Sequence, residues 1–176
     1  MNYQKILLSL MLAVTPFVGG MAQVSQITNT MRRTDKAFFK TDEARRVGDE
    51  ILLFQRVTGG WPKNIDMTRH LSGEETEQIR QDKSRRDDST TDNDATSTQL
   101  KFLARLWQQT KDNKYREGFA KGVEYLLSGQ YDNGGWPQFW PQNRGYQVHI
   151  TYNDDAMANT MMLLRDIADS KEPYQG

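Results

Sequence analysis

The chain contains two copies of one turn sequence, and this repeat constrains its fold more than any other feature. Residues 55–62 read Gln-Arg-Val-Thr-Gly-Gly-Trp-Pro, and residues 130–137 read Gln-Tyr-Asp-Asn-Gly-Gly-Trp-Pro. An acidic motif is also repeated, as Asp92-Asn-Asp-Ala95 and as Asn153-Asp-Asp-Ala156. Recurrence of this kind is typical of folds assembled from repeated supersecondary units. We therefore expect two related structural units.

The apolar residues between these motifs recur at helical spacing. The spacing predicts helices over residues 41–55, from beyond residue 94 to residue 110, over residues 114–127 and over residues 154–168. Ser72 and Glu75 form a capping box that predicts a short helix after them, within a charged and solvated stretch of residues 74–94. Residues 146–152 alternate between apolar and polar side chains, but they lack a partner strand. We expect an extended loop there.

The order of elements predicts an all-α fold. A helix, a Gln-x-x-x-Gly-Gly-Trp-Pro turn, a variable loop, an acidic cap and a second helix occur in this order twice. Repeated helix pairs of this kind form α/α toroids or solenoids, in which each unit buries its apolar face against its neighbours. Because two units do not close a ring, we expect an incomplete α/α toroid with long loops, part of a longer domain. Open helix faces would then favour self-association.

The N-terminal region resembles a secretory signal peptide over residues 1–22. Lys5 precedes an apolar run of about 13 residues, and Gly20-Met21-Ala22 is a small-x-small cleavage signal. A membrane anchor is the weaker interpretation, because a spanning helix needs roughly 20 residues. We expect a polar segment at residues 23–34, a toroid domain at residues 35–176, and a secreted or periplasmic protein with no membrane association after cleavage.

Charge and cysteine content exclude several classes of function. Without Lys5 the chain has 22 basic and 23 acidic residues, so it has no general attraction for nucleic acid or anionic membranes. It has no cysteine, which excludes disulfides and thiolate metal sites. The two histidines, His70 and His149, each lack a neighbouring histidine for a zinc site. A hard metal ion held by oxygen atoms remains open.

The repeated motifs suggest where chemistry takes place. An aspartate at a helix start is usually an N-cap, but each acidic motif here has more oxygen ligands than capping requires. Equivalent helix ends converge on one rim of a toroid, so the two clusters are expected to face each other and to hold Ca²⁺. Trp61 and Trp136 are expected to fasten their turns to the preceding helices. For Trp136, together with Trp140, a sugar-stacking platform is the alternative.

Four segments resemble the family 10 polysaccharide lyases, which are pectate lyases with an α/α toroid catalytic domain. They are Gly-Gly-Trp-Pro-Lys-Asn at 59–64, Asp-Asn-Asp-Ala-Thr-Ser-Thr-Gln at 92–99, Gly-Gly-Trp-Pro-Gln-Phe at 134–139 and Ile-Thr-Tyr-Asn-Asp-Asp-Ala-Met at 150–157. The resemblance implies β-elimination of polygalacturonate with Ca²⁺ bridging aspartates and a uronate carboxylate. It implies that Asp92, Asn93 and Asp154 bind calcium and substrate, with Asp155 a weaker metal ligand. Asp94 is not carried over, because the family often has glycine there.

One part of the family pattern has no match. The arginine that abstracts the proton lies well beyond the second acidic motif in the family, and Arg144 and Arg165 match no catalytic position. The catalytic residue is therefore unknown, and we expect a pectate lyase with weak or no activity. The alternative is a secreted, non-catalytic carbohydrate-binding or structural protein that grips sugar with Trp136, Phe139 and Trp140. The Q-x-x-x-G-x-W pattern also resembles terpenoid cyclases, but a signal peptide argues against an isoprenoid substrate.

Overall fold

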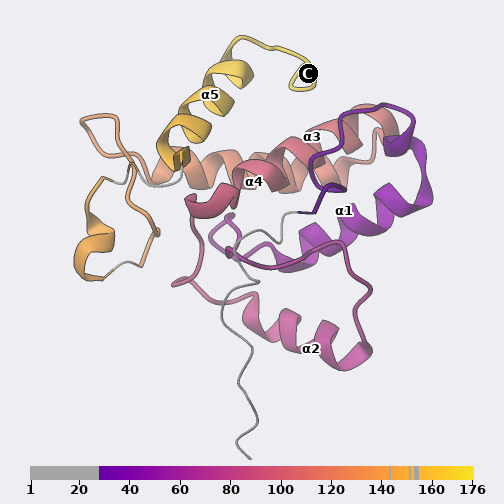
Figure 1. Ribbon diagram of the computed structural model, residues 1–176, viewed down its shortest axis with the longest axis horizontal. Coiled ribbons are helices and arrows are strands. Elements are labelled where there is room, and N and C mark those ends of the chain that lie inside the picture. Colours follow the sequence, from indigo (N-terminus) through magenta and orange to yellow (C-terminus); the bar gives the residue numbers. More distant parts are fainter. Residues whose placement is uncertain (1–27, 143, 151, 153–154) are drawn as a thin grey trace, which may run out of the picture.

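The structure, a computed structural model, describes residues 28–142, 144–150, 152 and 155–176. Its described part is helical, and the only β-pairings within it are two isolated bridges. The α-helices are α1 (Asp42–Phe54), α2 (Gly73–Asp82), α3 (Ser97–Thr110), α4 (Asn113–Ser128) and α5 (Ala156–Ala168) (Figure 1). Short 3₁₀ helices are η1 (Phe38–Lys40), η2 (Asp92–Asp94) and η3 (Gly145–Val148). The all-α prediction is confirmed.

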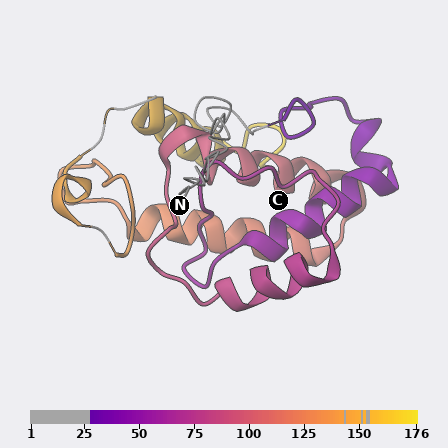
Figure 2. The same cartoon turned by 60° about the horizontal axis from the view of Figure 1, so that its bottom comes forward.

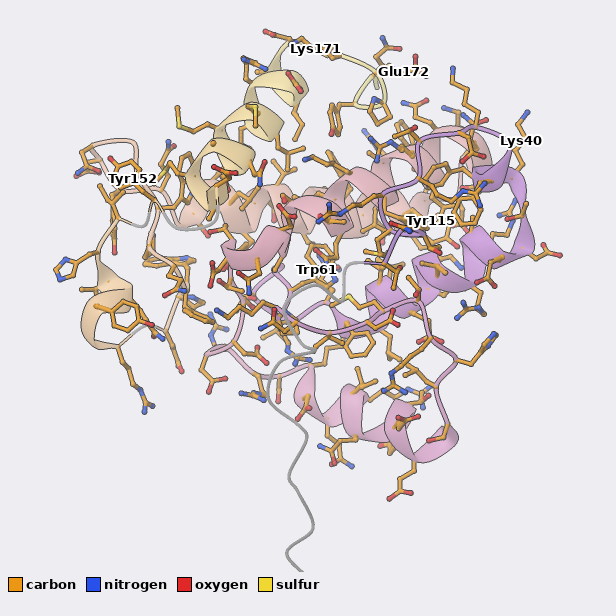
Figure 3. The ribbon with its side chains drawn as sticks, viewed as in Figure 1. Lys40, Trp61, Tyr115, Tyr152, Lys171 and Glu172 are labelled. Carbon is orange, nitrogen blue, oxygen red and sulfur yellow. The ribbon has the colours of Figure 1, made fainter. Side chains whose placement is uncertain are left out.

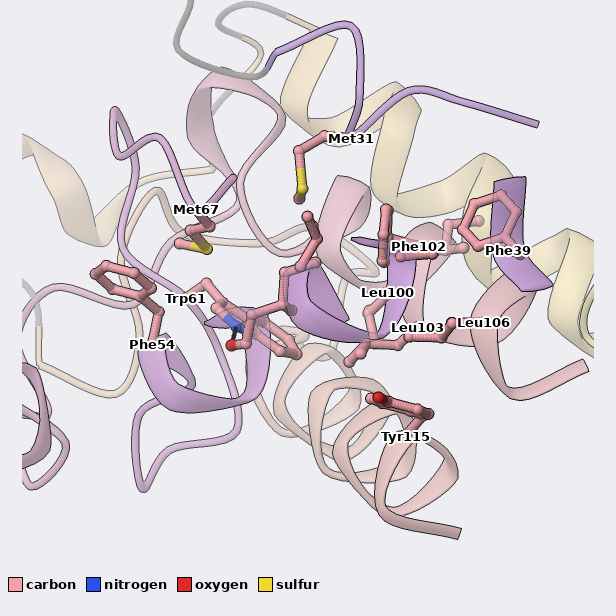
Figure 4. Close-up of a cluster of buried hydrophobic side chains, with 14 of the residues drawn as sticks. Met31, Phe39, Phe54, Trp61, Met67, Leu100, Phe102, Leu103, Leu106 and Tyr115 are labelled. Atoms are coloured by element: carbon pink, nitrogen blue, oxygen red, sulfur yellow. Dashed lines mark hydrogen bonds between the residues drawn. The ribbon is translucent and has the colours of Figure 1, made fainter. Parts of the chain in front are cut away.

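Helix α3 lies at the centre of the domain and packs against α1 and α4. In both views α2 and α5 lie on opposite sides of the α3–α4 pair (Figures 1 and 2). The core is a single cluster in which Leu100, Leu103 and Leu106 of α3 contact the other helices, and Trp61 inserts into it from the first turn (Figure 4). Burial of these side chains is the main favourable term in folding such a domain.

The helix starts follow the local sequence closely. Thr41 accepts a hydrogen bond from the amide of Ala44, and Ser72 and Glu75 form the predicted capping box. Asp112 accepts from the amide of Lys114 at the start of α4. Each cap satisfies an amide that has no partner inside its helix. The predicted helix bounds are confirmed to within a few residues.

Three details differ from the sequence predictions. The helical spacing of apolar residues over 114–127 predicts that Leu127 is buried in α4, but this residue is 56% exposed. Glycines let α4 approach its neighbours: a Cβ on Gly118 would lie 2.2 Å from Leu52 Cδ2, and one on Gly122 2.6 Å from Leu100 Cδ2. Residues 89–92 were expected to be solvated and are buried. Residues 145–148 form a 3₁₀ turn within the predicted loop.

The N-terminal segment that the structure describes packs on the domain. Met31 is 2% exposed and joins the main core cluster. The predicted signal peptide lies outside the described residues. No helix in the described part of the chain is long and apolar enough to span a membrane.

Candidate functional site

The two repeated turns adopt the same conformation. Gln55 Nε2 donates to Gly59 O at 2.8 Å, and Gln130 Nε2 donates to Gly134 O at 3.1 Å. The two glycines have φ angles of 93° and 88°, which residues with a side chain rarely adopt. The repeat in the sequence is therefore also a repeat in the backbone.

Both tryptophans fasten their turns to the preceding helix, as expected. Trp61 Nε1 donates to Ile51 O of α1 at 2.7 Å, and Trp136 Nε1 donates to Leu126 O of α4 at 2.6 Å. Both carbonyls belong to the last turns of their helices, where regular intrahelical partners run out. Leu126 O also accepts from the amide of the C-cap residue Gly129 at 3.3 Å. Trp136 is 4% exposed and so offers no open ring face. Phe139, in the same segment, is partly exposed.

Three of the four motifs meet at Asp92. Its Oδ2 accepts from Gln138 Nε2 at 2.6 Å and forms an ion pair with Lys63 Nζ. The residue is 1% exposed, so its charge depends on these partners. Lys63 Nζ also lies 5.5 Å from the ring centroid of Phe139, and Phe139 pairs with Thr90 in an isolated bridge. Lys63 and Gln138 are the first residues after the two Trp-Pro pairs.

The other two residues of η2 contact three separate segments of the chain. Asn93 Nδ2 donates to Asn64 Oδ1 at 3.0 Å. Asp94 Oδ1 accepts from Asn159 Nδ2 of α5 at 2.8 Å, and its Oδ2 accepts from Arg32 Nη2 at 2.9 Å. Asp94 therefore lies next to α5, the helix that follows the second acidic motif. Asn153 and Asp154 of that motif lie outside the described residues, so the expectation that the two acidic motifs face each other stays a prediction.

The acidic motif does not cap α3, although the sequence suggested that it opens the helix. Asn93, Asp94 and Thr96 have φ angles of 50°, 61° and 63°, and the N-cap residue Thr96 makes no capping side-chain hydrogen bond. The irregular backbone forms the separate turn η2. Left-handed backbone at non-glycine residues is uncommon and tends to gather at functional sites.

The predicted calcium ligands differ in how far they are buried. Asp92 is buried and paired, Asn93 is partly exposed, and Asp155 is exposed with a φ of 57°. Asp154 lies outside the described residues. Within the described part of the chain, no three acidic, histidine or cysteine side chains gather as a metal site. The donors that are present are oxygen atoms, the type that Ca²⁺ prefers.

Cations accompany the acidic cluster. Arg32 and Lys63 pair directly with Asp94 and Asp92. Lys101 is half-buried, and burial lowers its pKa from the ordinary value, while nearby Asp94 acts in the opposite direction. Three cationic side chains therefore border the acidic cluster.

A buried ion pair supports the segment that enters the site. Arg56 donates to Asp88 through Nε at 3.0 Å and through Nη2 at 2.8 Å, and its Nη1 has no hydrogen-bond partner in the described part of the chain. Arg56 follows Gln55 of the first turn, and Asp88 lies four residues before Asp92. This ion pair therefore links the first turn to the segment of the chain that leads into η2.

Sequence reasoning missed the side chains that hold the acidic cluster. These residues are Arg32, Lys63, Asn64, Gln138 and Asn159. A signal was present for Lys63 and Gln138, because both follow a repeated Trp-Pro pair. Arg32 and Asn159 lie outside the four motifs, so their roles required the tertiary structure.

Comparisons with known proteins agree on one family. A family model described as pectic acid lyase matches residues 55–176. Two solved structures of a family 10 polysaccharide lyase from Cellvibrio cellulosa, one an aspartate-to-alanine mutant in complex with trigalacturonic acid, are each 32% identical with a TM-score of 0.66. Each match covers 80% of this chain and 41% of the solved chain. No curated protein matches.

These lyases have the α/α toroid fold, to which the five described helices also conform. This chain spans less than half the length of the solved structures. The family model covers well over half of the chain. The chain therefore belongs to the pectic acid lyase family, the family 10 polysaccharide lyases.

Proposed function

We propose that this chain binds polygalacturonate and acts as a calcium-assisted pectate lyase with low activity on its own. The observation that carries the proposal is the convergence of the motifs: residues from both turns hold Asp92, and α5 contacts Asp94. The solved relative in complex with trigalacturonic acid supports a substrate of the same chemistry.

The chemistry of β-elimination explains why such a site needs cations. Removing the C5 proton beside a uronate carboxylate moves negative charge toward that carboxylate, so preorganised positive groups stabilise the transition state. Lys63 is partly exposed and its amine is oriented by Asp92 and by the Phe139 ring. We propose that Lys63 binds the carboxylate, since a held ammonium needs no reorganisation when the charge develops.

Calcium fits the donor chemistry of the site. We propose Asp92, Asn93, Asp154 and Asp155 as its ligands, all of which offer oxygen atoms. When bound, the ion supplies positive charge next to the substrate carboxylate. Asp94, which the sequence resemblance set aside, is 33% exposed and lies between Arg32 and Asn159, so it belongs to the same site.

We assign no residue of this chain to the role of proton acceptor. Arg165 pairs with Asp166 on α5, and Arg144 is close enough to contribute to lowering the pKa of Asp87. Neither matches the position of the family's catalytic arginine. We therefore propose that the chain binds its substrate better than it cleaves it. We also propose that Trp136, predicted to contact substrate, only holds its turn in shape.

The test separates binding from cleavage. Calorimetry measures binding of polygalacturonate with Ca²⁺ and with a chelator, and ultraviolet absorbance follows the unsaturated uronate product. We expect calcium-dependent binding, little product, and no binding of fully methyl-esterified pectin. Asp155→Asn should weaken binding in calcium, while Asp169→Asn at the other end of α5 should not. If polygalacturonate does not bind with or without calcium, the proposal is wrong.

A further inference from the structure

A segment that precedes the family match reaches the acidic cluster. Residues 28–34 form a turn in which the Met31 amide donates to Thr28 O at 3.0 Å and the Arg32 amide donates to Asn29 O at 3.2 Å. Thr28 Oγ1 also hydrogen-bonds to Thr68 Oγ1 at 3.2 Å. The side chain of Met31 belongs to the buried core cluster that also contains Met67 (Figure 4). The backbone at Arg32 is therefore held in place.

Asp94 orients the side chain of Arg32 but does not occupy all of its hydrogen-bond donors. Its Nη2 donates to Asp94 Oδ2, and Asn159 holds the other oxygen of the same carboxylate. The Arg32 side chain is 56% exposed, and no other described residue hydrogen-bonds to its guanidinium. A guanidinium has five N–H donors, so most of them make no hydrogen bond to another described residue. Such an exposed pair contributes only about 0–1 kcal/mol to folding.

We infer that Arg32 is a substrate-binding residue whose guanidinium, oriented by Asp94, binds a uronate carboxylate next to the acidic cluster. The inference rests on the proposed function. A planar guanidinium matches a carboxylate with two parallel hydrogen bonds. Lys101, half-buried nearby, adds a second positive charge to this side of the cluster. The residue would therefore select free uronates over methyl-esterified ones.

Its neighbour supplies a matched control. Arg33 carries the same charge on the same segment, but it donates to Asp35 through Nε at 2.8 Å and through Nη2 at 3.0 Å. It also lies 4.2 Å from the ring centroid of Phe38. Arg32→Ala and Arg33→Ala therefore change the net charge equally while removing only one guanidinium from the acidic cluster.

The experiment measures trigalacturonate and polygalacturonate binding by calorimetry in the full chain. Arg32→Ala should weaken binding about 10-fold to 100-fold, the range for a hydrogen-bonded charged pair. Arg32→Lys should restore part of the loss, and Arg33→Ala should change binding less than about 2-fold. Thermal unfolding of the variants should match that of the unsubstituted protein to within the small contribution of an exposed pair.

Four outcomes would overturn the assignment. If the unsubstituted protein binds and Arg32→Ala binds equally well, Arg32 does not touch substrate. Equal losses in Arg32→Ala and Arg33→Ala would indicate a general charge effect. A large fall in thermal stability for Arg32→Ala with no recovery in Arg32→Lys would indicate a structural role. If the unsubstituted protein does not bind, the proposed function fails, and the assignment fails with it.

Discussion

Replacing each repeated glycine with alanine tests how the two turns are held. Gly59 and Gly134 have nearly the same φ, so alanine pays a similar left-handed penalty at both, about 1–2 kcal/mol. Their surroundings differ. A Cβ on Gly59 would lie 2.2 Å from the backbone oxygen of Lys121 in α4, whereas a Cβ on Gly134 would have no atom within 4 Å. Overpacking adds about 1–3 kcal/mol at Gly59 alone.

The expected cost is therefore about 2–5 kcal/mol for Gly59→Ala and about 1–2 kcal/mol for Gly134→Ala. Urea unfolding followed by tryptophan fluorescence and by circular dichroism gives both free energies, provided that the urea dependence is unchanged. Gly73→Ala is the control, because a Cβ there meets nothing within 4 Å and Gly73 begins α2. It should be neutral or stabilising. Equal losses at Gly59 and Gly134, within about 0.5 kcal/mol, would refute the reasoning.

Two further predictions concern buried groups. Asp88→Asn leaves the buried Arg56 without its counter-charge and should lower the free energy of unfolding in urea by about 3–5 kcal/mol. The control Asp87→Asn removes an exposed partner and should lower it by less than about 1 kcal/mol. Similar losses for the two variants would contradict the interpretation of Arg56–Asp88 as a buried pair. Burial and a hydrogen bond to Asp49 raise the pKa of Tyr115 to about 12, from about 10 when unfolded. Because the folded state retains the Tyr115 phenol proton to a higher pH than the unfolded state does, the contribution of Tyr115 to stability is complete below about pH 10. This contribution is lost as the pH rises through about 12. Tyr115→Phe should therefore lose less stability over that range, and an unchanged slope would exclude Tyr115 as a cause.

Features set by short-range contacts were predictable from the sequence. The Gln55 side chain donates a hydrogen bond to a carbonyl four residues away, and the Trp61 side chain donates one to a carbonyl ten residues away. Ser72 and Glu75 cap a helix within a single turn. Chain connectivity brings such partners together at little entropic cost, so residue type and spacing are enough to predict them. The repeated turns, the helices and the fold class follow from this.

The candidate site depended on the tertiary structure. Asp92 meets Lys63 and Gln138 across 29 and 46 residues, and Asp94 meets Arg32 and Asn159 across 62 and 65 residues. These pairs depend on the packing of α3 against α1 and α4 and of α5 against η2. The sequence by itself determined which motifs carry carboxylate and amide oxygens and, to within a few residues, where the helices lie. Only the tertiary structure decided which of these side chains are buried with a counter-charge and which face solvent, because packing sets their distances.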